Sequence, residues 1–261
     1  MKLFISADIE GVCGVFSWKQ CSNDSERYRE ARLQMSREVR ALCERALEDG
    51  YTTITVKDAH NNAYNILHEE LPEGVELIRG WARTPSLMMD GLDESYDACA
   101  FIGYHSAGFT GDNPLAHSFD TELLWVKING ELVSEFDVNY YYAKALGVPA
   151  IFLSGDRALC EHAKKVEPLM RTVYTKDCVG GSAVSKHPES LLKEIRESLP
   201  AADQDFEMKE LQDATVEICY RDHVVAIKNS HYPGATLVAP HRIEFTVKDA
   251  HQLMRELLFL A

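Results

Sequence analysis

The segment Lys2-Leu-Phe-Ile-Ser-Ala-Asp8-Ile-Glu10-Gly11 decides how this chain folds. Its first six residues are mostly apolar or β-prone, and two acids and a glycine follow, which is typical of a buried strand that ends in a loop. Asp8 and Glu10 are two residues apart, so both carboxylates point to the same side of an extended chain. Two carboxylates this close repel each other unless a proton or a cation lies between them. The segment therefore predicts a buried strand with a cation site at its end.

Strand and helix patterns alternate over the first two thirds of the chain. Further buried strands are expected at residues 52–56, 98–103 and 149–153, and amphipathic helices at 26–48, 134–146 and 157–166. Residues 122–133 contain Asn129-Gly130 and predict a β-hairpin with a two-residue turn. Alternation of this kind predicts a three-layer α/β/α fold with a mainly parallel sheet that is covered on both faces.

The last third of the chain has a different pattern. We expect, in order, a helix over 191–199, a loop over 200–205, strands over 216–227 and 236–247, and a closing helix over 250–260. The sequence thus predicts an α/β metal-binding region at residues 1–170 and a smaller α+β region at 171–261. The boundary is weakly marked, so the two regions form either separate domains or one compact unit.

Composition excludes several classes of protein. The 261 residues carry a net charge of −14, which argues against binding to nucleic acid or an anionic membrane, because both need clustered Lys and Arg. We recognise neither a signal peptide nor the run of about 20 apolar residues that a membrane helix needs. Seven cysteines without a CxxC pair indicate reduced thiols rather than a disulfide framework. We expect a cytoplasmic protein.

Acidic or imidazole side chains follow every expected strand. Ligands of open α/β sheets bind at the carboxyl ends of the strands, so these side chains are expected to share one edge of the sheet. They are Asp8, Glu10, Asp58, His60, His105 and Asp156, with Glu135 at the start of the helix after the hairpin. Each of them alone has an ordinary structural explanation, but their common position favours a metal site. Mixed carboxylates and imidazoles suit Zn²⁺ or, less specifically, Mn²⁺ or Co²⁺, and carboxylates can bridge two ions in hydrolytic sites.

Two further residues keep alternative interpretations. His117 lies in a loop after the Gly- and Asp-containing stretch 108–114, and that loop can overhang the strand ends. An imidazole there is a general acid, a general base, an oxyanion stabiliser, a nucleophile or simply a surface histidine. Asp58 either orients the metal ligand His60 or serves as a turn residue.

The order of Ser6-Ala-Asp8-Ile-Glu10-Gly11, Asp58-Ala-His60, Gly103-Tyr-His105, His117-Ser118 and Glu135 resembles the M55 family of zinc D-aminopeptidases, which are DppA-like enzymes. The resemblance extends along nearly the whole chain. It implies two zinc ions per subunit, a catalytic role for His117, and ligands at Asp8, Glu10, His60, His105 and Glu135. It also implies that metal-activated water releases N-terminal D-amino acids such as D-alanine from short peptides. The expected assembly is a ring-like homo-oligomer, with a decamer as one candidate size.

Substrate preference and some rival functions stay open at this point. The best-known family members have Gly-Glu-Leu-Gly where this chain has Ser134-Glu-Phe-Asp137, so a preference for D- or L-residues is not fixed. An amidase acting on cell-wall peptides would share the chemistry. A Mg²⁺-dependent phosphohydrolase would leave the histidines unexplained, and a non-catalytic peptide-binding protein would not need His117.

Overall fold

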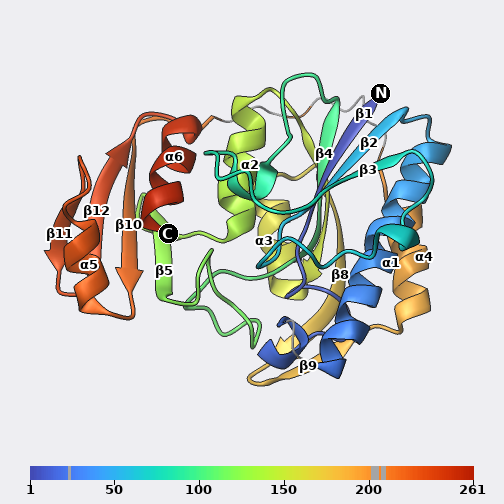
Figure 1. The fold of residues 1–261 in the computed structure, drawn as a ribbon, viewed down its shortest axis with the longest axis horizontal. Coiled ribbons are helices and arrows are strands. Elements are labelled where there is room, and N and C mark those ends of the chain that lie inside the picture. Colours follow the sequence, from blue (N-terminus) through green and yellow to red (C-terminus); the bar gives the residue numbers. More distant parts are fainter. Residues whose placement is uncertain (23–24, 201–205, 207–209) are drawn as a thin grey trace.

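The computed structural model describes all residues except 23–24, 201–205 and 207–209, and it contains two β-sheets (Figure 1). The first sheet has the strand order β3-β2-β1-β4-β7-β8-β9. Its strands are β1 (Lys2–Ala7), β2 (Thr53–Asp58), β3 (Val75–Ile78), β4 (Ala98–Tyr104), β7 (Ala150–Asp156), β8 (Arg171–Val179) and β9 (Ser182–Ser185). All neighbours are parallel except β8 and β9. This confirms the prediction of a mainly parallel sheet.

Helices cover both faces of the first sheet. They are α1 (Glu26–Glu48) and α4 (Pro188–Glu197) on one face, and α2 (Glu135–Ala145) and α3 (Arg157–Val166) on the other. Alternate side chains of β1 enter two different cores. Leu3 and Ile5 belong to the core formed with α1 and α4, whereas Phe4 belongs to the core formed with α2 and α3. The strand is therefore buried on both sides, as its nearly continuous apolar sequence predicts.

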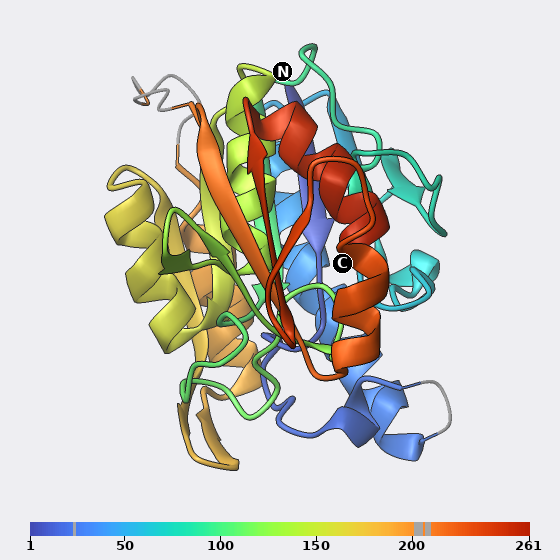
Figure 2. The same cartoon turned by 90° about the vertical axis from the view of Figure 1, so that its left-hand side faces the viewer.

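A second, antiparallel sheet lies beyond α2 (Figures 1 and 2). Its order is β11-β12-β10-β5-β6. The strands are β5 (Leu123–Ile128), β6 (Glu131–Leu132), β10 (Ala214–Tyr220), β11 (Thr236–Ala239) and β12 (Arg242–Val247). Helix α6 (Ala250–Leu260) packs against both α2 and β12, and α5 (His223–Asn229) packs against β10 and β12. Short 3₁₀ turns η1, η2 and η3 occupy Trp18–Gln20, His68–Glu70 and Leu87–Met89.

The last third differs from the prediction in two places. The pattern predicts one strand over 216–227, but β10 ends at Tyr220 and α5 begins at His223, after the Asp222 carboxylate accepts the amide of Val224. Residues 236–247 form the two antiparallel strands β11 and β12 rather than one strand. The expected loop over 200–205 falls almost wholly outside the described residues.

The two sheets do not divide the chain at residue 170. Strands β8 and β9 extend the first sheet, and α4 packs on α1. The β5-β6 hairpin, which lies in the first two thirds of the sequence, pairs with β10 in the second sheet. The hairpin belongs there because Leu123, Val126 and Ile128 are buried in the same core as α6. Within the described residues, no helix has the length and apolarity needed to cross a bilayer.

The strand order places a binding crevice between β1 and β4. The chain continues from β1 to β2 on one side, and from β4 toward β7 on the other, so the order reverses between β1 and β4. Ligands of open α/β sheets bind at such a switch point. Gly103 has φ +71°, and a Cβ there would lie 2.3 Å from the carbonyl oxygen of Asp8. Glycine at this position therefore allows the loops after β1 and β4 to approach each other closely.

Candidate metal centre

The structure brings together all five predicted ligands at the switch point. Asp8 and Glu10 follow β1, His60 follows β2, His105 follows β4, and Glu135 is the first residue of α2. All five side chains are buried, with at most 8 % of any residue exposed. The placement follows from the strand ends, because parallel neighbours deliver their next residues to the same edge.

Distances divide the cluster into two adjacent groups around Asp8. His60 Nδ1 lies 3.2 Å from Asp8 Oδ1 and 3.0 Å from Glu10 Oε2. His105 Nε2 lies 3.4 Å from Asp8 Oδ2 and 3.4 Å from Glu135 Oε2. The two oxygens of Asp8 therefore face different imidazoles, one in each group.

The backbone fixes which nitrogen each imidazole presents to the cluster. His60 Nε2 lies 2.8 Å from the carbonyl oxygen of Cys21, and His105 Nδ1 lies 3.0 Å from that of Ser106. A carbonyl oxygen only accepts hydrogen bonds, so these nitrogens carry the protons. The opposite nitrogens, Nδ1 of His60 and Nε2 of His105, are then the ones free to bind a cation.

Several buried atoms of the cluster lack hydrogen-bond partners among the described residues. They are Asp8 Oδ2, both carboxylate oxygens of Glu10, and His105 Nε2. Buried carboxylate oxygens without donors are costly, and a metal ion is one of the few groups that satisfies them. Ligand atoms of Asp8, Glu10 and His105 lie within 4.8 Å of one another, and so do those of His105, His117 and Glu135. The donors therefore fit a metal centre.

The pKa values show how strongly the cluster requires positive charge. Burial, followed by the neighbouring Glu10 carboxylate, raises the pKa of Asp8 to about 8. Burial opposes ionisation of Glu10 as well, but His60 lowers the pKa of Glu10 well below its usual value. Burial opposes the charged form of His105, yet Glu135 raises the pKa of this imidazole to about 10. Without a cation, the cluster holds protons in its place.

The start of α2 holds Glu135 in position. Ser134 caps the helix: the Asp137 carboxylate accepts the Ser134 amide at 2.7 Å, and the Ser134 hydroxyl accepts the Asp137 amide at 3.4 Å. This is the reciprocal pattern of a capping box. Glu135 Oε1 also accepts the amide of Phe119 at 2.7 Å. The residues that depart from the family pattern therefore still form a rigid helix start, and the helix dipole there favours an ionised carboxylate.

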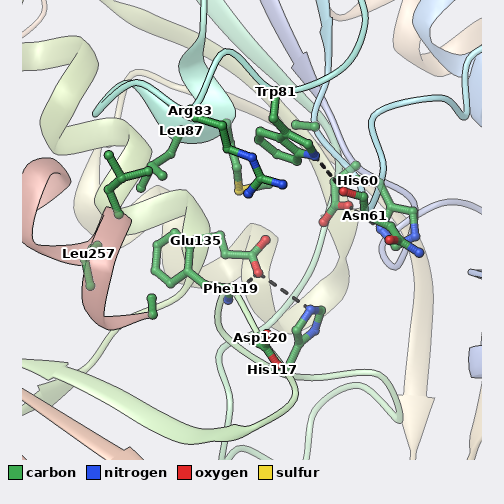
Figure 3. Close-up of a pocket in the computed structure, with 15 residues that line it drawn as sticks. His60, Asn61, Trp81, Arg83, Leu87, His117, Phe119, Asp120, Glu135 and Leu257 are labelled. Carbon is green, nitrogen blue, oxygen red and sulfur yellow. Dashed lines mark hydrogen bonds and ion pairs between the residues drawn. The ribbon is translucent and has the colours of Figure 1, made fainter. Parts of the chain in front are cut away.

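His117 overhangs the cluster from the loop between β4 and β5. Its ring stacks on that of His105, with centroids 4.4 Å apart and planes 5° from parallel, and Trp18 packs edge-on against it. Nδ1 lies 3.0 Å from the carbonyl oxygen of Leu115, so Nδ1 carries a proton and Nε2 is the nitrogen turned toward the cluster. Nε2 faces Glu135 Oε1 at 3.7 Å (Figure 3). His117 is thus part of the site and not a surface histidine.

Asp58 is a turn residue. Its carboxylate accepts the amides of Asn65 and Ile66 and the side chain of Asn65, and the Asn65 side chain donates in turn to the carbonyl of His60. It contacts no imidazole of the cluster directly. Its effect on His60 passes through the backbone that it holds.

Asp156, which ends β7, holds together two parts of the loop between β4 and β5, the part next to His105 and the part that leads to His117. It accepts the amide and hydroxyl of Ser106, next to His105, and the side chain of Asn113, in the loop that carries His117. It also caps α3 through the amide of Leu159. A fully buried carboxylate with four donors is held firmly, so the two imidazoles keep their relative position.

A cavity of about 370 Å³ opens onto the cluster (Figure 3). Its walls include Asp8, His60, Glu135 and His117, and also residues that the sequence analysis did not single out: Trp81, Arg83, Leu87, Met88, Phe119, Asp120 and Leu257. The volume is that of a site for a small ligand. Nothing in the spacing of these residues marks them, because they come from loops, from the 3₁₀ turn η3 and from α6, far apart in the sequence.

Comparison with known proteins identifies the family. The sequence profile of the Peptidase_M55 family, described as D-aminopeptidase, matches residues 1–259. The chain belongs to this peptidase family. Membership confirms the resemblance seen in the sequence and places the chain among peptide hydrolases.

Individual relatives agree with this assignment. A D-aminopeptidase of Bacillus subtilis (strain 168) is 30 % identical over 184 residues, which cover 70 % of this chain and 66 % of the relative. A solved structure described as the zinc-dependent D-aminopeptidase DppA from Bacillus subtilis, a self-compartmentalizing protease, is similar with a TM-score of 0.92. It is 24 % identical, and the match covers 100 % of this chain and 96 % of that one. The M55 fold is therefore shared over the full length.

Proposed function

We propose that this protein is a dinuclear zinc aminopeptidase that releases N-terminal D-amino acids such as D-alanine from short peptides. The observation that carries the proposal is the buried cluster of three carboxylates and two imidazoles. Oxygens of Asp8 and Glu10 lack hydrogen-bond partners among the described residues, and Asp8, His60 and Glu135 line the cavity. Membership in a family described as D-aminopeptidase supports the activity. The relative described as zinc-dependent supports the choice of metal.

The two groups around Asp8 support a count of two ions. His60 and Glu10 would hold one zinc ion, His105 and Glu135 the other, and Asp8 would bridge them because its two oxygens face different groups. Bound zinc supplies Lewis acidity: it lowers the pKa of water toward about 7 and polarises a carbonyl. Neutral imidazoles and ionised carboxylates are the forms that bind metal.

His117 would move a proton during hydrolysis. Its Nδ1–H bond to the Leu115 carbonyl leaves Nε2 free to accept a proton and to return it to the leaving amine. Stacking against His105 and Trp18 holds the ring over the cluster. The same nitrogen lies close enough to Glu135 and His105 to ligate a metal, so metal content decides between the two roles.

The test combines metal analysis with a substrate panel. Purified protein should contain about two zinc ions per chain, and it should hydrolyse D-aminoacyl dipeptides faster than their L-isomers. A chelator should abolish this activity, and zinc should restore it. Full activity after removal of the metal, or dipeptide binding without turnover, would overturn the proposal.

Two variants separate ligands from the proton carrier. Glu10→Gln should lose zinc, whereas the matched change of the exposed Glu30 on α1 to Gln should not. His117→Ala should keep both ions and lose at least about 100-fold in kcat, the contribution expected of a general acid or base. Loss of one zinc ion from His117→Ala would identify His117 as a ligand instead.

We also propose that the subunits assemble into a ring-like homo-oligomer. The relative described as self-compartmentalizing supports an enclosed assembly. Large apolar side chains are exposed on α5, β11 and α6, and contacts between subunits would bury them: Val224, Ile227, Leu237, Val238 and Phe259. Light scattering should give a multiple of the 29.4 kDa chain mass, and a decamer would weigh about ten times as much. A monomer at micromolar concentration would contradict the assembly.

A further inference from the structure

Arg83 is the one Lys or Arg among the described residues that line the cavity. Figure 3 shows its side chain pointing into the cavity, which also contains Glu135 and His117. In the described part of the chain, no carboxylate lies within ion-pair distance of the Arg83 guanidinium, and no hydrogen bond to it occurs. Five N–H donors are thus available to a ligand.

The loop that carries Arg83 is built to hold it there. The buried Asp90 carboxylate accepts the amide of Ala82 on one side of Arg83, and the hydroxyls of Thr84 and Ser86 on the other. Arg83 itself has φ +59°, a left-handed backbone conformation that is strained for a residue with a Cβ. Strain of this kind persists where the surroundings enforce it, and it concentrates at functional sites.

A second anchor fixes the start of the same loop. The Trp81 indole donates to the carbonyl of Asn61 at 2.6 Å, and Asn61 is the residue after the metal-ligand candidate His60. Lys57, at the end of β2, donates to the carbonyl of Gly80 and lies over the Trp81 ring. The position of Arg83 is therefore tied to the strand end that carries the metal centre.

We propose that Arg83 binds the C-terminal carboxylate of the peptide substrate and thereby selects short peptides. This proposal rests on the aminopeptidase function proposed above, in which the free amine of the substrate lies at the metal centre. Guanidinium and carboxylate pair in a two-pronged geometry, which gives orientation as well as affinity. A cavity of about 370 Å³ between the metal ligands and Arg83 suits a peptide of two or three small residues.

The rest of the cavity agrees with this orientation. Leu87, Met88, Phe119 and Leu257 line it with apolar groups, which suit the methyl group of an alanine residue. Among the described lining residues, Asp120 is the one acid that is not a predicted ligand. Its charge would repel a substrate carboxylate placed close to it. Arg83 therefore determines where the negative end of a dipolar peptide lies.

The experiment compares peptides that differ only in the carboxylate. Zinc-loaded wild type, Arg83→Met and Arg83→Lys are assayed with D-Ala-D-Ala, with its C-terminal amide, and with a D-Ala-D-Glu peptide amidated only at its C-terminus. Met keeps the Cβ and an unbranched apolar stem but removes the guanidinium and its charge. Arg37→Met, which removes an exposed arginine of α1 outside the cavity, is the matched control.

Arg83→Met should raise KM for D-Ala-D-Ala about 10- to 100-fold with kcat changed less than twofold, as for loss of a charged hydrogen-bond pair. KM for the C-terminal amide should be the same in wild type and Arg83→Met. For D-Ala-D-Ala, the KM of Arg83→Lys should lie between the KM values of wild type and Arg83→Met. Equal effects on acid and amide, or none, would overturn the proposal. An effect confined to the D-Glu peptide would also overturn it, because Arg83 would then recognise a side chain.

Failure of the proposed function has a different signature. If wild type hydrolyses no peptide, calorimetry measures binding of D-Ala-D-Ala and its amide to the same zinc-loaded variants. If wild type binds D-Ala-D-Ala more tightly than its amide and Arg83→Met does not, Arg83 still binds the carboxylate, although the protein does not hydrolyse the peptide. Equal binding of acid and amide by wild type and Arg83→Met would overturn it.

Discussion

Glu38 of α1 gives a quantitative prediction about the loop after β1, which begins with the candidate metal ligands Asp8 and Glu10. Its carboxylate is fully buried, and Oε1 accepts the amide of Cys13 and the side chain of Gln34, both at 3.0 Å. Among the described residues Oε2 has no hydrogen-bond partner. Burial raises the pKa of Glu38 from the ordinary 4.5 to about 7. Glu38→Gln keeps an acceptor for Cys13 and removes the charge.

The sign and size of the effect follow from this pKa. Between pH 4.5 and 7 the folded protein holds the Glu38 proton more tightly than the unfolded chain does. This contribution to stability is complete below pH 4.5 and is lost as the pH rises through 7. A pKa shift from 4.5 to about 7 corresponds to about 3 kcal/mol in the free energy of unfolding. The free energy of unfolding of Glu38→Gln minus that of wild type should therefore rise by about 3 kcal/mol between pH 4 and 8.

Urea unfolding at several pH values, at one protein concentration and one free zinc concentration, measures this difference. Taking the difference cancels the titration of groups at the metal centre, which both proteins share. Glu30→Gln, an exposed change on the same helix, should give a flat difference curve. A flat curve for Glu38→Gln, or one that falls with pH, would refute the assignment of a proton to Glu38 in the folded protein.

Three more substitutions test how the site is held. Gly103→Ala places a Cβ 2.3 Å from the carbonyl oxygen of Asp8, so calorimetry should show that the protein is destabilised by more than about 3 kcal/mol. An unchanged Tm would contradict the close approach of the loops after β1 and β4. Asp156→Ala removes the acceptor that joins the His105 and His117 parts of the β4–β5 loop, and kcat should fall at least about 10-fold with most of the zinc retained. Wild-type kinetics of this variant would exclude the role. Asn65→Ala removes the donor to the His60 carbonyl and should weaken zinc affinity about 10-fold in a chelator competition; unchanged affinity would show that the turn does not depend on it.

Local patterns were sufficient to predict most of the fold. The apolar run of β1 and the three- and four-residue spacing along α1 give elements at the expected positions, because burial of one face or both dictates the period. The sequence His223-Val-Val-Ala-Ile227 is rich in β-branched residues, and it is nevertheless helical after the Asp222 cap. The partner of each strand was harder to predict than the strand itself. The β5-β6 hairpin pairs with β10, about 90 residues later, through contacts that no local pattern encodes.

The clustering of the five candidate metal ligands was predictable for a reason that does not extend to the cavity. Asp8, His60 and His105 follow parallel strands, and the sheet itself brings such positions together. Arg83 follows no strand directly. Its place in the cavity depends on the buried Asp90 and on a left-handed backbone, and neither is visible in the sequence.

Charge at the site links the metal proposal to the proposal for Arg83. The protein carries −14 overall, and three of its carboxylates lie in the cluster, where protons on Asp8 and on the imidazoles offset the negative charge as long as no cation is bound. Two zinc ions with neutral imidazoles would make the cluster positive, because four positive charges exceed three negative ones. Arg83 would add positive charge at the other part of the same cavity. A zwitterionic peptide would then enter an electropositive cavity in an acidic protein, and its carboxylate rather than its amine would be the end that is attracted from solution. Removal of zinc should therefore weaken binding of D-Ala-D-Ala more than binding of its amide, and calorimetry on the metal-free protein measures this; equal weakening of both would show that the cavity field does not depend on the metals.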